Sequence, residues 1–165
     1  MLYFIDKYHL QKYGEVVLNN RYYRLPKGPI PSLTLNLLNE FFDPEWEYTV
    51  NGIKINKIYL SEYLEAAERY RLKLKKESSF GSLSQLELEI IDEVIKTYGN
   101  LKTGDLVEAY HKDATWLRTE EPNEIDYYLF LEGMTEDKKK VIEGLLLIDK
   151  ENEIFASILE NDCNS

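Results

Sequence analysis

Aromatic side chains recur at helical spacing near the start of this sequence, and a glycine follows them at position 14. Tyr3, Phe4 and Tyr8 would lie on one side of a helix over residues 2–13, because positions about one turn apart face the same direction. Gly14 is well placed to end this helix, since glycine readily adopts the left-handed conformation found after many helices. The segment therefore predicts an N-terminal helix that is aromatic on its buried side.

The next segment combines a short aromatic strand with a stiff turn. Residues 21–25 are typical of a short β-strand that ends at a proline. Residues 27–32 contain two prolines around one permissive glycine, so we expect an ordered loop there. A second helix is expected over residues 33–42, with Ser32 as its N-cap and Asp43-Pro44 at its end.

An Asn-Gly pair at positions 51 and 52 predicts a β-hairpin between residues 47–50 and 53–59, because both central residues of a type I′ turn need positive φ. Residues 61–67 are expected to form a short helix. The stretch 69–76 alternates basic with aromatic or aliphatic residues. Two interpretations are open: a half-buried third strand on the same sheet, or a basic surface that binds RNA or an acidic partner. The strict alternation favours the strand. The residues expected on its buried face are Tyr70, Leu72 and Leu74.

Helical signals dominate the second half of the chain. Ser84 and Glu87 have the spacing of a capping box, and the helix that follows is expected to run to Tyr98 and stop at Gly99. Further segments are a helix over residues 103–111, a turn over 113–117 and a charged loop over 119–126. A last helix begins at Thr135 and either continues to residue 158 or breaks near residues 149–152. The inward side of the helix after Ser84 is predicted to carry Leu88, Ile91, Val94 and Ile95.

These elements predict an α+β fold that is mainly α-helical, with a small antiparallel hairpin or three-stranded sheet. A chain of 165 residues is long enough for one domain with its own core and too short for two comfortable ones. We expect a single compact domain over residues 1–160. Residues 161–165 are expected to be a disordered tail.

The composition narrows the classes of partner. The formal net charge of −10 opposes contact with phosphates, so nucleic acid is not expected as a partner. No apolar run approaches the roughly 18 to 20 residues of a membrane-spanning helix, so no membrane association is expected. Cys163 is the single cysteine of the sequence, which rules out an internal disulfide and favours a reducing, cytoplasmic location.

Two histidines, His9 and His111, are the first candidates for chemistry, and each has an aspartate nearby. Asp6 and His9 lie three positions apart on one helix, which favours a local surface pair over a catalytic one. His111 is expected to pin a loop by a hydrogen bond to the backbone. The sequence has no Gly-Xaa-Ser-Xaa-Gly or phosphate-binding loop, and too few histidines and cysteines for a zinc site, although carboxylates could bind a hard cation. We therefore expect no enzyme activity, no cofactor and no metal site.

Several of these features occur in a fixed order that matches a known family. The first block is Leu2–Asp6 with His9-Leu10 and Gly14, and the second is Tyr22-Tyr23 before Gly28-Pro29. The later helix from Ser84 and the pair His111 and Trp116 complete the pattern. Over roughly residues 2–118 the sequence therefore resembles the Panacea domain, also called the SocA-like domain, of bacterial and phage proteins.

The resemblance implies an antitoxin that holds a cognate protein toxin inactive by direct binding. It also implies two alternatives: an adaptor that delivers a toxin to a bacterial ATP-dependent protease, or a phage-associated protein that binds a host factor. Family members usually carry a further helix before the Leu-Tyr-Phe block. Either the true start lies upstream of Met1, or this chain lacks that helix. We favour the second alternative and expect the aromatic side of the first helix to be uncovered and to serve partner binding or self-association as a homo-oligomer.

The resemblance and the aromatic pattern together suggest which residues carry these roles. The loop over 27–32 could contact a partner, because a stiff loop loses little entropy on binding, or could be a structural lid over the first helix. The residues expected to bind the partner are Tyr3, Phe4, Tyr8, Tyr22, Tyr23, Lys27, Gly28 and Pro29. The residues expected to be structural parts of the family pattern are Asp6, His9, Gly14, His111 and Trp116.

Overall fold

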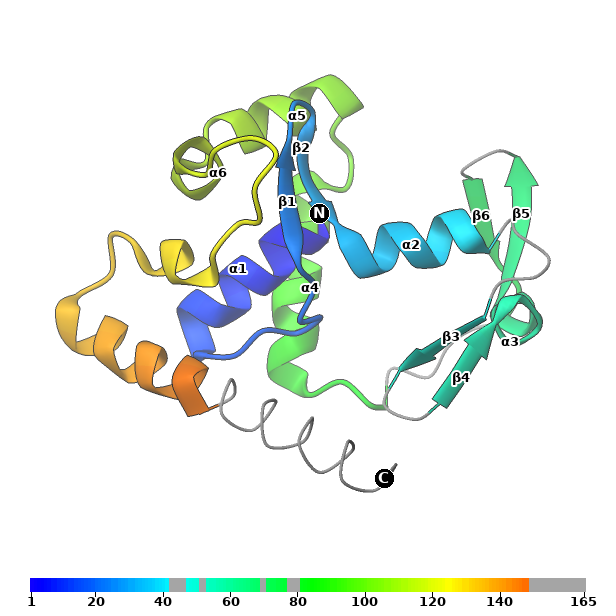
Figure 1. Ribbon diagram of the computed structural model, residues 1–165, viewed down its shortest axis with the longest axis horizontal. Coiled ribbons are helices and arrows are strands. Elements are labelled where there is room, and N and C mark those ends of the chain that lie inside the picture. Colours follow the sequence, from blue (N-terminus) through cyan, green and yellow to red (C-terminus); the bar gives the residue numbers. More distant parts are fainter. Residues whose placement is uncertain (42–46, 51–52, 69–70, 77–80, 149–165) are drawn as a thin grey trace, which may run out of the picture.

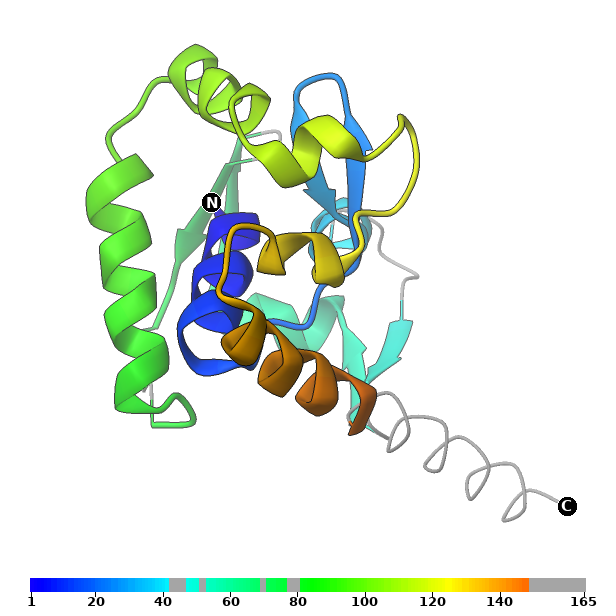
Figure 2. The same ribbon diagram turned by 90° about the vertical axis from the view of Figure 1, so that its left-hand side faces the viewer.

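Helix α1 (Leu2–Tyr13) lies at the centre of the fold, with the other core elements packed around it (Figures 1 and 2). The computed structural model describes residues 1–41, 47–50, 53–68, 71–76 and 81–148. The predicted bounds of α1 are confirmed, and Gly14 ends it with φ at +87° while its N–H donates to the Leu10 carbonyl over 2.9 Å. The α+β, mainly helical fold class is also confirmed.

Strands β1 (Tyr22–Leu25) and β2 (Gly28–Pro31) form an antiparallel hairpin in which Tyr22 pairs with Pro31 and Leu25 with Gly28. The prediction of a loop over residues 27–32 is therefore wrong, because most of that segment is a strand. Proline is tolerated in β2 because β1 is its one strand partner in the described part of the chain, so the missing amide hydrogens interrupt no second ladder.

Helix α2 (Ser32–Glu40) follows β2 without a break and leads away from the core. Ser32 is its first helical residue and Pro31 occupies the N-cap position, so the prediction of Ser32 as the cap is wrong. The backbone has no room for a separate cap, since β2 ends where α2 begins. The expected end of this helix at Asp43-Pro44 lies outside the described residues.

Beyond α2 the chain forms two hairpins and a short helix on the far side from α1 (Figure 1). Strands β3 (Glu47–Val50) and β4 (Ile53–Asn56) confirm the predicted hairpin, whose two turn residues lie outside the described residues. The helix expected over 61–67 is wrong: α3 (Lys57–Tyr63) starts earlier and shortens β4. Strand β6 (Arg71–Leu74) pairs with β5 (Leu64–Glu68) in a separate sheet, so the three-stranded sheet is wrong, and Leu74 is exposed rather than half-buried.

The second half of the chain returns to the core. Helix α4 (Gln85–Tyr98) begins with the predicted capping box, in which the Ser84 amide donates to Glu87 over 2.6 Å and the Glu87 amide donates to the Ser84 hydroxyl over 3.3 Å. Ile90 and Val94 are its buried residues, whereas Ile95, expected to face inward, is half exposed. The remaining elements are α5 (Thr103–His111), α6 (Ala114–Arg118), η1 (Tyr127–Leu131) and a helix over residues 136–148.

An aromatic cluster forms the centre of the core. The Tyr3 ring meets the rings of Phe4, Tyr22 and Phe130 edge-on, with centroids 5.3, 5.5 and 5.2 Å away. Phe4 also stacks on Tyr98 at 4.3 Å and on Tyr110 at 4.9 Å. The expectation of an uncovered aromatic side is therefore wrong, because α4, α5, β1 and η1 of the same chain cover it.

The domain prediction extends past the described residues. Residues from the ranges 1–41 and 81–148 share one hydrophobic core, and the division into domains stays a prediction. The expected limit at residue 160 and the expected tail over 161–165 lie outside the described residues and stay predictions.

Candidate functional site

The carboxylate of Asp6 is buried and fixes the loop that follows α1. It accepts hydrogen bonds from the amides of Val17 and Leu18, over 2.9 and 2.7 Å, and from the Tyr22 hydroxyl over 2.7 Å. Burial raises the pKa of Asp6 above its ordinary value of 3.8, while these donors oppose the shift. Asp6 therefore ties the end of α1 to strand β1.

His9 serves the same loop from the next turn of α1. Its Nδ1 lies 2.8 Å from the carbonyl oxygen of Glu15, so the ring donates a hydrogen bond to the backbone there. Its Nε2 is buried and has no hydrogen-bond partner among the described residues. The expected surface pair of Asp6 and His9 is wrong, since both side chains are buried and each holds a different backbone group.

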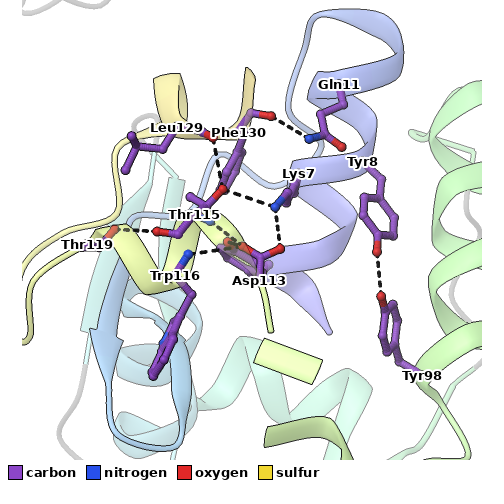
Figure 3. A network of polar contacts seen from close by, with 11 residues as sticks. Lys7, Tyr8, Gln11, Tyr98, Asp113, Thr115, Trp116, Thr119, Leu129 and Phe130 are labelled. Carbon is purple, nitrogen blue, oxygen red and sulfur yellow. Dashed lines mark hydrogen bonds and ion pairs between the residues drawn. The ribbon is translucent and has the colours of Figure 1, made fainter. Parts of the chain in front are cut away.

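A second buried polar group joins α1 to α6 (Figure 3). The Lys7 ammonium lies 2.5 Å from one oxygen of Asp113, and the Tyr3 hydroxyl donates to the other oxygen over 2.7 Å. Asp113 also caps α6 by accepting from the amides of Thr115 and Trp116 over 3.1 and 3.2 Å. Sequence reasoning missed this pair. Asp113 before a short helical stretch is a cap signal, but nothing in the sequence marks Lys7 as buried.

The Thr115 hydroxyl extends this network to η1. It accepts from Lys7 over 3.2 Å and donates to the Leu129 carbonyl over 3.1 Å, and Gln11 donates to the neighbouring carbonyl of Phe130 over 2.6 Å (Figure 3). On the other side of α1, the hydroxyls of Tyr8 and Tyr98 are 2.6 Å apart. These polar contacts fix the position of α1 on the elements that surround it.

His111 and Trp116 support the tip of the β1–β2 hairpin. The His111 Nε2 lies 2.9 Å from the Pro26 carbonyl, which confirms the expected loop-pinning role. The ring of His111 stacks on the indole of Trp116 with centroids 4.5 Å apart, and the Arg24 guanidinium lies 4.2 Å from the Trp116 ring centroid. Arg24 in turn donates to the carbonyls of Leu117 and Thr119.

Gly28 lets β2 approach α5 closely. Its φ is +121°, a conformation that favours glycine, and a Cβ atom at this position would lie 2.5 Å from Cδ2 of Tyr110. The outer side of the hairpin is fixed as well. The Arg24 amide donates to the Asn123 carbonyl over 3.0 Å, and the Ile125 amide donates to the Tyr22 carbonyl over 2.7 Å. The hairpin is therefore held from both sides.

We call the outward side chains of this region the hairpin surface; they are Tyr23, Arg24, Lys27 and His111. Lys27 and His111 are exposed, while Tyr23 and Arg24 are half-buried. Tyrosine and arginine are enriched among the residues that dominate protein–protein binding energies. A rigid surface of this composition can bind another polypeptide at a low cost in conformational entropy.

The structure divides the residues expected to bind a partner into two groups. Most of them are interior residues: Tyr3, Phe4, Tyr22, Gly28 and Pro29 are buried, and Tyr8 is half-buried against α4. Tyr23 and Lys27 lie on the hairpin surface, where partner binding stays a prediction. Sequence reasoning missed Arg24 as part of this surface, although an arginine in a short aromatic strand is a usable signal.

The described residues gather no group of three or more His, Cys, Asp or Glu side chains that could hold a metal ion. The two histidines each bond to a backbone carbonyl, of Glu15 and of Pro26. Within the same described ranges, no helix is both long and apolar enough to cross a membrane.

The fold and this site define a mainly helical α+β domain whose buried polar groups hold a short aromatic hairpin in place. The chain belongs to the family described as antitoxin SocA-like, Panacea domain, whose family model matches residues 1–117. The family supports an antitoxin-type role and suggests a toxin as the partner. Searches of curated proteins and of solved structures found no match.

Proposed function

We propose that this protein is the antitoxin of a bacterial or phage toxin–antitoxin pair and holds a cognate protein toxin inactive by direct contact, without enzyme activity of its own. The observation that carries the proposal is the family match over residues 1–117, which includes α1, the hairpin and α5. Within this range, the side chains of Asp6, His9 and His111 bond to the chain's own backbone, as expected for a binding scaffold.

The hairpin surface is the proposed contact with the toxin. It combines aromatic and guanidinium groups with an exposed lysine, and it stands on a strand pair whose position is fixed by His111, Arg24 and the close packing of Gly28 on Tyr110. A surface held in this way is already in its binding conformation, so association costs little ordering. The exposed ammonium of Lys27 fits a carboxylate or carbonyl on the toxin, whereas the Arg24 guanidinium already holds the hairpin in place.

Long-range electrostatics supports a basic toxin. The net charge of −10 gives the molecule a negative field that attracts a positively charged protein and raises the rate of encounter. A toxin that acts on RNA or ribosomes has this sign of charge. The negative field would therefore raise the rate at which the toxin is encountered, and the hairpin surface would determine where the toxin binds.

The test uses the product of the open reading frame next to this gene as the candidate toxin. Purified toxin is assayed for its activity with and without this protein, in the absence of any protease. We expect inhibition by the wild-type chain and, for Lys27→Glu or Tyr23→Ala, an inhibition constant raised by about tenfold or more. Lys96→Glu on α4 is the matched control, because it makes the same charge change at an exposed position away from the hairpin.

Two results would contradict the proposal in different ways. If the purified protein leaves toxin activity unchanged and lowers toxin levels in cells that contain an ATP-dependent protease, the adaptor alternative is correct instead. If inhibition is strong but equally sensitive to Lys27→Glu and Lys96→Glu, the contact lies elsewhere than on the hairpin surface.

A further inference from the structure

Arg24 uses only one end of its guanidinium group to hold the hairpin. Its Nη1 donates to the backbone carbonyls of Leu117 and Thr119, and its Cζ lies 4.2 Å from the centroid of the Trp116 ring. The opposite edge of the group consists of Nε and Nη2. Nε is buried, and neither nitrogen donates to any residue that the structure describes. One edge of the guanidinium is therefore free.

Arg21, just before β1, shows what this edge of an arginine holds beside the same hairpin. Its Nε lies 3.0 Å from each oxygen of the Glu124 carboxylate, and its Nη2 donates to one of them. Two parallel N–H donors match the two oxygens of a carboxylate in spacing and in charge. Arg24 presents the same pair of donors without a carboxylate opposite them.

The positive charge of Arg24 is also unpaired. Arg24 is half-buried, and charged groups that leave water are normally paired with an opposite charge. Its acceptors in the described part of the chain are two neutral carbonyls, so no carboxylate there compensates the charge. The acidic residues of the segment against which Arg24 packs, none of which forms an ion pair with it, are Asp113, Glu120, Glu121, Glu124, Asp126 and Glu132.

A second donor beside Arg24 lacks an acceptor as well. Trp116 is 6% exposed, and its indole Nε1 is buried without a hydrogen-bond partner among the described residues. Figure 3 shows the indole directed away from the Lys7–Asp113 pair, on the side of α6 where the hairpin lies. Buried N–H groups almost always have an acceptor. A water molecule can satisfy an indole, but only an anion compensates the charge of a guanidinium.

We propose that one carboxylate of the toxin pairs with the free Nε–Nη2 edge of Arg24, beside the indole of Trp116. This inference rests on the proposed function and names the chemistry of one contact at the hairpin surface. Nη2 is a terminal atom of the half-buried side chain, so the carboxylate meets it first, and a small rotation of the guanidinium then brings Nε to the second oxygen. Leu117 is 52% exposed next to Arg24 and supplies an apolar rim that excludes water from the pair. A toxin that is basic overall still carries single carboxylates, so the contact is compatible with the long-range attraction.

A double-mutant cycle in the inhibition assay tests the pair. Arg24→Lys keeps the positive charge and removes the planar edge, so we expect it to raise the inhibition constant for the candidate toxin by about tenfold or more. On the toxin, each Asp and Glu is replaced in turn by Asn or Gln, and one further variant carries an added C-terminal glycine that displaces the terminal carboxylate. One of these toxin variants should bind the wild-type chain more weakly by a similar factor and should show no further loss against Arg24→Lys.

The matched control is Arg21→Lys, because the corresponding edge of Arg21 already binds Glu124. Arg21 is exposed, and its replacement should change the inhibition constant much less. If Arg24 acted only by holding the hairpin, Arg24→Lys would weaken the inhibition of every toxin variant by the same factor. That result would overturn the proposal, and so would an equal effect of the two arginine substitutions.

A second pair of variants leaves Arg24 in place. Leu117→Glu brings a carboxylate of this chain within reach of Arg24, where it competes with the toxin, and Leu117→Gln has the same size without the charge. Leu117→Glu should raise the inhibition constant by about tenfold relative to Leu117→Gln, and equal inhibition by the two would contradict the proposal. If the wild-type chain itself fails to inhibit, the proposed function is refuted and this contact with it. Inhibition that couples to no carboxylate of the toxin refutes the contact alone.

Discussion

Replacement of Gly28 by alanine tests how the hairpin is held against α5. Two costs follow from the structure. A side chain at a φ of +121°, beyond the left-handed helical region, strains the backbone by about 1–3 kcal/mol. The added Cβ would also lie 2.5 Å from Cδ2 of Tyr110, and such overpacking costs a further 1–3 kcal/mol or so.

The expected loss for Gly28→Ala is therefore about 2–6 kcal/mol, a large part of the 5–15 kcal/mol by which folded domains are typically stable. Gly133→Ala is the matched control, because Gly133 also has a positive φ, of +81°, but a Cβ there would meet no atom within 4 Å. It should lose only the strain, about 1–2 kcal/mol. Both losses are measured as free energies of unfolding in urea, followed by circular dichroism and tryptophan fluorescence.

The comparison of the two variants decides whether the close packing on Tyr110 matters. If Gly28→Ala and Gly133→Ala lower the free energy of unfolding equally, the close packing of Gly28 on Tyr110 has no energetic effect. The explanation of how the hairpin is held would then be wrong. A second check is Gly28→Ala combined with Tyr110→Leu, which takes the ring away from the new Cβ. The combined loss should be smaller than the sum of the two single losses, since one substitution relieves the clash made by the other.

Two further predictions concern the buried polar groups. Burial raises the pKa of Asp6 in the folded protein, so the folded state binds the proton more tightly than the unfolded state and the contribution of Asp6 to stability falls as pH rises above about 4. Asp6→Asn should remove this trend, so urea unfolding of wild type and variant from pH 4 upward should show a free-energy difference that moves against the wild type as pH rises; a constant difference would contradict it. Lys7→Met should cost about 3–5 kcal/mol because it leaves the Asp113 carboxylate buried without its cation, and Asp113→Asn in the Lys7→Met background should recover part of that loss; additive losses in the double variant would show that the pair is not coupled.

Local signals predicted the helices whose ends carry strong cap residues. Gly14 after α1 and the pair Ser84 and Glu87 before α4 act within a few residues of their own position, so the sequence contains the whole interaction. The prediction for β2 was wrong because its structure depends on a partner strand and not on local signals alone. Its two prolines point to a loop by local criteria, and they fit a strand only because β1 alone pairs with it among the described strands.

The same distinction applies to the site. The backbone role of His111 could be inferred because the sequence lacks the other parts of a catalytic site, and its bond to the Pro26 carbonyl confirms it. The Lys7–Asp113 pair could not be inferred from the sequence, because its members are 106 positions apart and lysine is rarely buried. The sheet arrangement after α2 was also misjudged, since alternation predicts a strand but not which strand pairs with it.

The residues of the family pattern have one property in common in this structure. Asp6, His9 and His111 each bond to backbone groups, Gly14 supplies a left-handed turn, and Trp116 is the platform on which His111 and Arg24 lie. Asp6, His111 and Trp116 therefore hold the hairpin. His9 and Gly14 hold the end of α1 and the chain that follows it. If the hairpin surface is the toxin contact, the choice of toxin depends on side chains such as Tyr23 and Lys27, which make few of these supporting bonds. On that proposal, exchange of an outward side chain should cost little stability, whereas loss of a supporting side chain should displace the hairpin surface itself.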